Sequence, residues 1–501
     1  MAVHPLKDLS EAEFKLAGDV VKKLYSSEVT LFFRAIYLQE PKKAELIPFL
    51  QAEHEGTLND STPHPPRRAR LQYDVIKNGK LPEYTTSIVD LETKTEAERI
   101  VAKPESQTGY TPDEFGAFQD ACIASPLFKD AMSEFSLPEN FTVTIDPWPY
   151  GGPDPSDGAI PRTMQGLVFA RDAAANNLDS NHYAYPIPII PVMDFTTKKI
   201  VRVDRLATGG KDDPLHPQPM NTSAGPKPLF TTKITPGADY VPELLDVPQR
   251  ADLKPINITQ PEGASFTVHS DNLVSWQKWR FRLGFTPREG AVLHDLCYDN
   301  RPVLFRLSYS ELTVPYGDPR PPFQRKQAFD LGDGGFGRVA NNLELGCDCL
   351  GAIHYFDALL ADAGGNPTVA KAVVCLHEQD NGIGWKHTNF RTNRAVVTRL
   401  RELVVQCVVT LANYEVEDWP VMPVEIHQMH IRPADFFTSN PALDMPGARN
   451  KTSVIVPCCG ESGQNGAKGA KEGGSVQRDP AAHLQGPGPD VDAEDAGAHT
   501  R

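Results

Sequence analysis

The spacing of apolar and polar residues near the start of this chain predicts both helices and strands. Residues 8–100 open with Ser10-x-x-Glu13, a capping box that predicts the start of an amphipathic helix. The apolar side chains of that helix are Phe14, Leu16, Val20, Val21 and Leu24. A strand is expected over 29–38, and Asn78-Gly79 predicts a hairpin between apolar runs at 71–76 and 85–91. Residues 8–100 are therefore predicted to form a small α+β domain.

The next hundred residues repeat this order. Thr111-Pro112-Asp113-Glu114 is a second capping box, with proline at the first helical position. Strand-like runs follow at 141–145, 166–170 and 200–203. Residues 101–210 therefore predict a second small α+β domain. Residues 211–262 are rich in Pro, Gly and Asp without periodicity, which predicts a linker.

Strand patterns dominate the chain from residue 263 to residue 446. The predicted strands are Phe266–Val268, Trp276–Phe281, Val292–Leu296 and Val303–Tyr309. Closely spaced strands without intervening helices favour an antiparallel sheet. Residues 447–501 contain few bulky apolar side chains, so we expect a disordered tail there.

Composition narrows the function classes. The 501 residues carry a formal net charge of -15, which disfavours nucleic acid as the main partner. No apolar run approaches the ~18–20 residues that span a bilayer, so no membrane insertion is expected. The first residues lack an apolar signal segment. These observations predict an intracellular protein, cytoplasmic or peroxisomal.

The valine-rich run 403–409 leads directly into the most informative stretch of the sequence. The run predicts a strand covered on both faces, although its pattern also fits a buried helix. Thr410-Leu411-Ala412-Asn413-Tyr414-Glu415 follows it. On residue type alone Tyr414 is an ordinary core tyrosine, because tyrosine is a common buried amphipathic residue.

Thr-x-x-Asn-Tyr-Glu nevertheless resembles the cofactor motif of the copper-containing, topaquinone-dependent primary-amine oxidases. Segments 328–332, 345–351 and 385–388 support the resemblance upstream of this motif, and 417–423 and 436–442 support it downstream. The resemblance implies the fold of that family: two small α+β domains followed by an antiparallel β-sandwich catalytic domain. It also implies oxidative deamination of a primary amine by O2 to aldehyde, ammonia and hydrogen peroxide.

The resemblance assigns roles to four residues. Tyr414 corresponds to the precursor of topaquinone, which forms a Schiff base with the amine, and Asn413 to the residue that orients the quinone ring. Tyr316 corresponds to a tyrosine that hydrogen-bonds the quinone. Asp330 corresponds to the catalytic base, whose pKa must be raised by an apolar pocket. By composition alone, Asp330 in a glycine-rich stretch is more readily interpreted as an aspartate exposed in a turn.

One feature departs from the family pattern. In the family a block of strands separates the tyrosine motif from Glu-Asp-Trp-Pro, whereas only Val416 lies between Glu415 and Glu417 here. The family's three copper-binding histidines belong to that block, and this chain has no His-x-His pair. The sequence therefore supports two hypotheses: an amine oxidase using copper and topaquinone, or a truncated and inactive relative that binds or dimerises.

His427 and His430 are the nearest downstream histidines. Their segment alternates like a strand, in which residues three apart point to opposite faces. We therefore do not expect them to bind one ion together.

Two further expectations come from the resemblance. Cys349 and Cys375 correspond to an intradomain disulfide, whereas the predicted intracellular location alone favours free thiols. The family is also homodimeric, which implies a second copy of the chain as partner.

Overall fold

The structure is a computed structural model that describes residues 3–431 except for certain gaps. The gaps are 104–105, 107, 151–161, 175–177, 207–226, 229–238, 240, 246–250, 316–326, 347 and 409–425. At 227–228, 310, 312–315, 327–330 and 426–431 only the backbone is described. The predicted tail 447–501 lies outside the described residues, as does most of the predicted linker.

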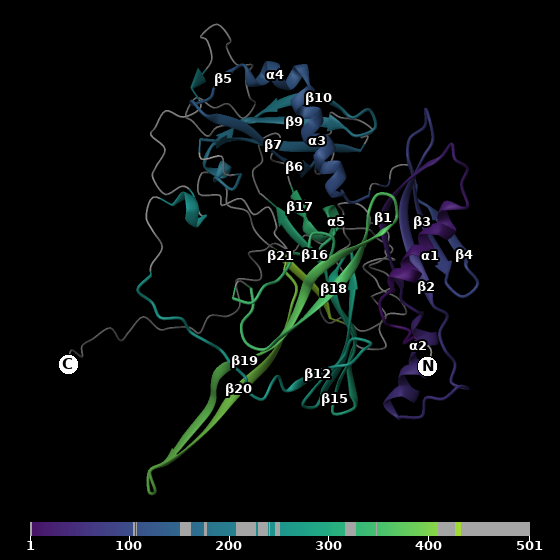
Figure 1. Ribbon diagram of the computed structural model, residues 1–501, viewed down its shortest axis with the longest axis vertical. Coiled ribbons are helices and arrows are strands. Elements are labelled where there is room, and N and C mark those ends of the chain that lie inside the picture. The colour runs from purple at the N-terminus through teal and green to yellow at the C-terminus, as the bar shows by residue number, and fades with distance from the viewer. Residues whose placement is uncertain are drawn as a thin grey trace, which may run out of the picture.

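The first unit is a four-stranded antiparallel sheet with two helices. Its elements are α1 (Glu11–Lys22), β1 (Thr30–Gln39), α2 (Lys43–His54), β2 (Arg68–Ile76), β3 (Glu83–Asp90) and β4 (Thr95–Val101). The strands follow one another in the order β1-β2-β3-β4. Figure 1 shows this unit along one side of the molecule.

Local sequence signals explain most of this unit. Both hydrogen bonds of the Ser10–Glu13 capping box are present, and Gly79 has the positive φ of 70° that its turn requires. Leu24 was expected on the apolar face of α1, but the helix ends before it and its side chain is exposed. Helix α2 was not predicted, because Pro48 lies inside it and its apolar residues show no clear periodicity.

The second unit packs two helices against another antiparallel sheet. Its elements are α3 (Pro112–Ala124), α4 (Pro126–Met132), β5 (Phe135–Ser136), β6 (Phe141–Pro149), β7 (Thr163–Asp172), η1 (His182–Ala184), β8 (Pro186–Ile187), β9 (Ile189–Asp194) and β10 (Lys199–Arg205). The main path is β10-β9-β7-β6, and β8 pairs with β7. The predicted capping box of Thr111 and Glu114 starts α3.

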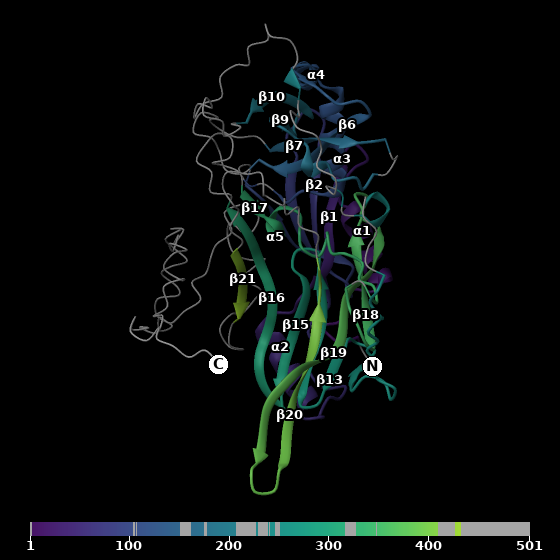
Figure 2. The same ribbon diagram turned by 90° about the vertical axis from the view of Figure 1, so that its left-hand side faces the viewer.

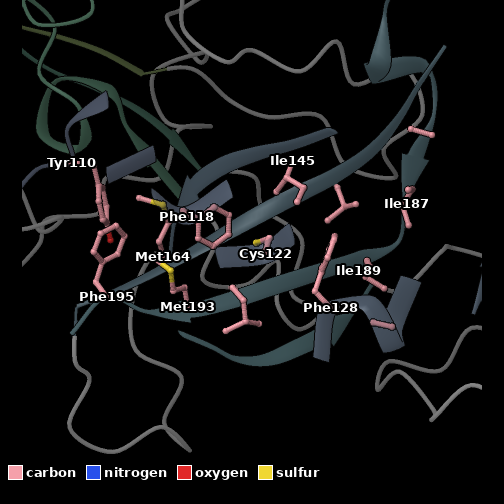
Figure 3. Close-up of a cluster of buried hydrophobic side chains, with 14 of the residues drawn as sticks. Tyr110, Phe118, Cys122, Phe128, Ile145, Met164, Ile187, Ile189, Met193 and Phe195 are labelled. Carbon is pink, nitrogen blue, oxygen red and sulfur yellow. The ribbon is translucent and has the colours of Figure 1, made fainter. Parts of the chain in front are cut away.

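A dense apolar core holds the second unit together. Phe118 of α3, Met164 of β7 and Ile189 of β9 have no exposed surface, and Figure 3 shows how the side chains of this cluster meet. A short strand, β11 (Lys227–Pro228), pairs in parallel with β5 of this unit. The turn η3 (Pro242–Leu244) is the other regular element described in the predicted linker.

Two antiparallel sheets make up the rest of the described chain. The seven-stranded sheet contains β12 (Phe266–Val268), β13 (Leu273–Trp276), β14 (Trp279–Thr286), β15 (Gly290–Tyr298), β16 (Arg301–Pro315), β17 (Gln327–Phe329) and β21 (Ile426–Ile431). The three-stranded sheet contains β18 (Ile353–Ala361), β19 (Pro367–Asn389) and β20 (Arg394–Gln406). A four-residue helix, α5 (Asp330–Asp333), follows β17.

One predicted strand is wrong. Trp276–Phe281 was expected to be continuous, but β13 ends at Trp276, which pairs with Trp279 at the start of β14. Gln277 adopts a φ of 54° in the intervening turn. A glycine or asparagine usually marks such a turn, so an apolar run containing glutamine concealed it.

The two sheets share an apolar cluster. Phe281 and Leu283 of β14 pack with Phe356 of β18 and Val374 of β19. Beyond this cluster β19 and β20 continue as a two-stranded ribbon that projects from the molecule (Figures 1 and 2). The run 403–406 is thus a strand within β20, and the helical alternative is wrong for those residues. Its predicted burial on both faces is also wrong there, because residues 403–406 are only half-buried.

Buried ion pairs attach the first unit to the seven-stranded sheet. Arg306 donates to Glu40 of the first unit at 2.9 Å and to Glu289 of its own sheet at 2.7 Å. Arg282 of β14 donates to Glu53 of α2 at 2.6 Å. Removing one partner from such a pair leaves an uncompensated buried charge, so these contacts fix the first unit in place.

None of the helices described is long and apolar enough to cross a bilayer.

Candidate active site

Asp330, the predicted base, is the first residue of α5. Strand β17 leads into it, and β17 pairs with β16 through Thr313–Phe329, Val314–Ala328 and Pro315–Gln327. The side chain of Asp330 lies outside the described part of the structure. The backbone that positions it, however, is described in detail.

Glu311 of β16 fixes the chain immediately after Asp330. One of its carboxylate oxygens accepts hydrogen bonds from the backbone nitrogens of Leu331 at 2.9 Å and Gly332 at 3.2 Å. The other oxygen accepts from Nη2 of Arg288 at 3.2 Å. Glu311 is only 2% exposed. Sequence analysis missed this residue, although a glutamate within a strand-like run is an available signal for a buried, paired carboxylate.

The turn after α5 is held by both N-terminal units. The backbone nitrogen of Tyr110 donates to the carbonyl of Asp333 at 2.5 Å. Arg338 donates to the carbonyls of Gly334 at 2.8 Å, Tyr110 at 2.9 Å and Arg34 at 2.7 Å. The carbonyls of Asp333 and Gly334 in the glycine-rich turn are therefore held by the backbone of Tyr110 and by the guanidinium of Arg338, respectively.

A buried cluster of ion pairs lies next to Tyr110, the residue that holds this turn. Arg34 of β1 donates to Asp74 at 2.6 Å and to Glu114 of α3 at 3.0 Å. Arg162 donates to the same Glu114 at 3.0 Å. Burial alone raises the pKa of a carboxyl group, but here Arg34 and Arg162 hold the pKa of Glu114 down at about 2. The cluster is therefore charged at neutral pH, and it connects the first unit to the second.

A cavity of about 60 Å³ lies against the backbone of Leu331 and Gly332. Arg34, Arg288 and Arg338 are among the residues that line it. Nε and Nη1 of Arg288 are buried without a partner in the part of the chain that the structure describes. Two of these guanidinium groups are paired with carboxylates, Arg34 with Asp74 and Glu114 and Arg288 with Glu311.

The remaining predicted residues, Tyr316, Asn413 and Tyr414, lie outside the described residues. The chain toward Asn413 and Tyr414 can be followed as far as Val408, whose carbonyl accepts from the backbone nitrogen of Asn341 at 2.8 Å. The structure therefore describes the chain that leads toward the predicted quinone position, up to Val408, but not Asn413 or Tyr414 themselves.

Cys349 and Cys375 lie beside this segment of the chain. The structure pairs their sulfur atoms as a disulfide, and both side chains are buried with Leu343 and Val408 in one cluster. Their Cα atoms are 7.5 Å apart, which exceeds the usual range of about 4.4–6.8 Å. His377 lies close enough for the three residues to form one group of potential metal ligands.

The described residues do not fit the family's copper centre. Two groups of potential ligands occur among them, Cys349 with Cys375 and His377, and His54 with Asp295 and Cys297. Each contains a single histidine. His427 and His430 lie on β21, where they pair with Leu312 and Ser308 of β16, so the predicted strand is confirmed. Their spacing of three residues places them on opposite faces of that strand.

Family comparisons decide the ancestry of the chain. The profile described as "Copper amine oxidase, N2 domain" matches residues 4–99. The profile described as "Copper amine oxidase, enzyme domain" matches residues 267–416 and, separately, 415–452. The chain belongs to the copper amine oxidase family. The two matched segments of this family member meet at 415–416, where the sequence predicts the missing block.

Individual relatives agree. Copper amine oxidase 1 of Aspergillus niger is 53% identical over 83% of this chain and 60% of its own length. The protein named N-methylputrescine oxidase 1, peroxisomal, of Nicotiana tabacum is 36% identical over 82% of this chain and 53% of its own length. The chain thus spans little more than half the length of these two curated relatives.

A solved structure shows the same fold. A copper-containing benzylamine oxidase from Hansenula polymorpha superposes with a TM-score of 0.71 at 33% identity, covering 86% of this chain and 64% of that one. The predicted class is therefore confirmed at the level of mostly antiparallel sheets with few helices, as in the copper amine oxidases.

Proposed function

We propose that this chain carries the framework of a primary-amine oxidase, whose reaction is oxidative deamination of a primary amine by O2. The products of that reaction are an aldehyde, ammonia and hydrogen peroxide. Asp330 is assigned as the base, Tyr414 as the quinone precursor, and Tyr316 and Asn413 as residues that orient the ring. Family membership supports the assignment, together with the backbone of α5, which Glu311 holds through the nitrogens of Leu331 and Gly332.

We further propose that the 501-residue chain does not itself form the cofactor. One observation carries this second proposal: the enzyme-domain profile matches in two segments that meet at 415–416. The family's copper-binding histidines fall between those segments, and the chain contains no His-x-His pair to replace them. Copper is expected to be held mainly by imidazole nitrogen, so a chain without converging histidines lacks the family's metal centre. Its antiparallel sandwich is accordingly incomplete.

The projecting ribbon supports a homodimer. Trp385 and Phe390 on β19 and its turn are 54% and 77% exposed, and Leu400 on β20 is exposed as well. Large apolar side chains along a ribbon with no neighbour among the described residues favour contact with a second protein surface. A second copy of this chain is the partner proposed. Replacing Trp385 and Phe390 together with serine is expected to convert dimer to monomer in sedimentation velocity.

We also propose that Cys349 and Cys375 form a disulfide bond in the protein. Non-reducing peptide mapping tests this proposal directly. A dominant pair that involves Cys297 or Cys407 would contradict it. Location is proposed as cytoplasmic or peroxisomal, because the tobacco relative is named as peroxisomal.

Insertion of the missing block tests the functional proposal. The segment of the Aspergillus niger relative that lies between its two matched regions is placed between Glu415 and Glu417. With copper and O2, the extended chain is expected to release peroxide in proportion to amine, whereas the 501-residue chain releases none.

An Asp330→Asn variant of the extended chain serves as the control. It should still form the quinone, because formation does not require the substrate base, but it should lose most amine turnover. Loss of the quinone in this variant would show that Asp330 is structural. Peroxide release by the chain without the insert would contradict the proposed inactivity.

A further inference from the structure

Three side chains of different chemistry meet where the first unit touches the seven-stranded sheet. His54 is the last residue of α2, and Asp295 and Cys297 lie two residues apart on β15. Nε2 of His54 lies 2.6 Å from Oδ2 of Asp295 and 4.0 Å from Sγ of Cys297. The same sulfur lies 3.6 Å from Oδ1 of Asp295. Imidazole, carboxylate and thiol thus face one point.

The spacing of these donor atoms suits a small divalent ion. Zinc binds nitrogen and oxygen at about 2.0–2.2 Å and sulfur at about 2.3 Å, and tetrahedral geometry then separates the donors by roughly 3.3–3.8 Å. The two distances to sulfur are already close to this range. The distance from His54 to Asp295 must open by about 1 Å, which side-chain rotation at the end of α2 can provide.

The charges around the group also suit a cation. A thiolate, a carboxylate and a neutral imidazole together neutralise a divalent ion. Nη1 of Arg280 donates to Oδ2 of Asp295 at 2.9 Å and would orient the carboxylate from behind. Nη2 of Arg280 is bound in turn by Glu53 at 2.5 Å, so the arginine adds no unbalanced charge. Cys297 is 1% exposed, whereas the His54 side chain is 18% exposed and leaves a path for entry.

We propose that His54, Asp295 and Cys297 form a binding site for a divalent ion of the zinc type, with water as the remaining ligand. The ion would join α2 of the first unit to β15 of the sheet. This site requires none of the residues assigned to amine oxidation. The Cys349 group is less suited to it, because its two sulfur atoms are already paired with each other.

In the metal-free chain, a proton on His54 competes with the ion for the imidazole nitrogen. The hydrogen bonds of His54 to Asp295 and Cys297 raise the pKa of its imidazole to about 9. Binding of the ion must displace the proton from His54.

Cobalt provides a direct probe of the site. The full chain, freed of metal with a chelator and without added reductant so that the sulfur atoms of Cys349 and Cys375 stay paired, is titrated with Co²⁺ alone. One equivalent is expected to produce the near-ultraviolet charge-transfer absorption of a thiolate–cobalt bond, and Zn²⁺ is expected to abolish it. No amine, oxygen or quinone enters the assay, so failure here leaves the proposed oxidase framework untouched.

Variants assign the signal to these residues. Cys297→Ser should remove the absorption, and His54→Gln should weaken Co²⁺ binding at least tenfold, as loss of a ligand contact commonly does. Cys122→Ser, a buried free cysteine in α3, is the matched control and should behave as the parent chain does. Absence of the absorption in the parent chain, or its persistence in Cys297→Ser, would overturn the proposal. If Cys297→Ser does not fold, unchanged binding by His54→Gln would overturn it instead.

Discussion

The second unit and the two later sheets bury their apolar side chains in different ways. Phe118 and its neighbours are fully enclosed by helices and strands from the same hundred residues (Figure 3). In the later sheets Leu403 and Val405 are only partly buried against the shared cluster. Leu359 of β18 packs against the core of the first unit rather than its own. The second unit is therefore complete in itself, whereas the sheets depend on segments far away in the sequence.

This difference indicates which part of the chain should stay folded when a block of strands is missing elsewhere. A core built from one contiguous segment keeps its contacts when a distant part of the chain changes. A sheet that lacks neighbours exposes its inner face and its edge, both of which favour aggregation. The N-terminal units should accordingly remain folded in a form that lacks the copper-binding block.

The largest expected effect is in limited proteolysis. Because the second unit holds a complete core and the first unit draws only Leu359 and Ala361 from the sheets, digestion should leave a resistant fragment that ends near 205–265. The sheet region should be degraded first, beginning with the exposed ribbon of β19 and β20. Mass spectrometry of the fragments identifies their ends. Greater resistance of residues 264–446 would reverse the comparison.

The next largest difference is expected in how much stability the protein loses when a ring is removed from each region. Phe118→Ala removes a ring with no exposed surface, and such changes cost about 3–5 kcal/mol of unfolding free energy. Phe390→Ala changes an exposed ring on the ribbon and should alter stability by less than about 0.5 kcal/mol. Urea unfolding followed by circular dichroism measures both. Equal effects would show that the core of the second unit does not dominate its stability.

Sequence patterns predicted the N-terminal units well because their signals are local. Capping boxes at Ser10 and Thr111 and the turn glycine Gly79 each act within a few residues. The signals failed where a turn used Gln277 and where Pro48 lay inside a helix. In both places the surrounding packing outweighs local preference.

The site was less accessible to sequence analysis. Resemblance supplied Asp330, Tyr414, Tyr316 and Asn413, and the structure describes only the backbone of Asp330 among them. Glu311, which positions that backbone, lies in a strand-like run that signals a buried carboxylate, but the sequence does not show what the carboxylate binds. Its role depends on a partner 20 or more residues away, which periodicity does not reveal.

The remaining effects concern pH at the contact between the first unit and the sheet. Burial lowers the pKa of His294 to about 4, below its ordinary 6.5, so the unfolded chain binds an additional proton between these values. This contribution to stability is complete above pH 6.5 and is lost as pH falls toward 4. As the pH falls over that range, the unfolding free energy of His294→Gln should therefore rise, relative to that of the parent chain, by about 1.4 kcal/mol per pH unit.

Asp8 gives the opposite sign and serves as the control. Burial raises the pKa of its carboxyl group from 3.8 to about 7, so the folded chain binds the additional proton. Its contribution to stability is complete below pH 3.8 and is lost as pH rises toward 7. Asp8→Asn should therefore gain stability relative to the parent as pH rises from 4 to 7. Parallel slopes for the two variants in urea unfolding would contradict both assignments.

Tyr414 provides the most direct test of the account. Conversion of a tyrosine to a quinone in place requires a copper ion held near the ring, and this chain contains no His-x-His pair that could hold one in the manner proposed for the family. The 501-residue protein is incubated aerobically with copper and then titrated with phenylhydrazine, which forms a coloured adduct with quinone carbonyls. The account predicts no adduct and an unmodified Tyr414 peptide in mass spectrometry. A stoichiometric adduct that maps to Tyr414 would contradict it.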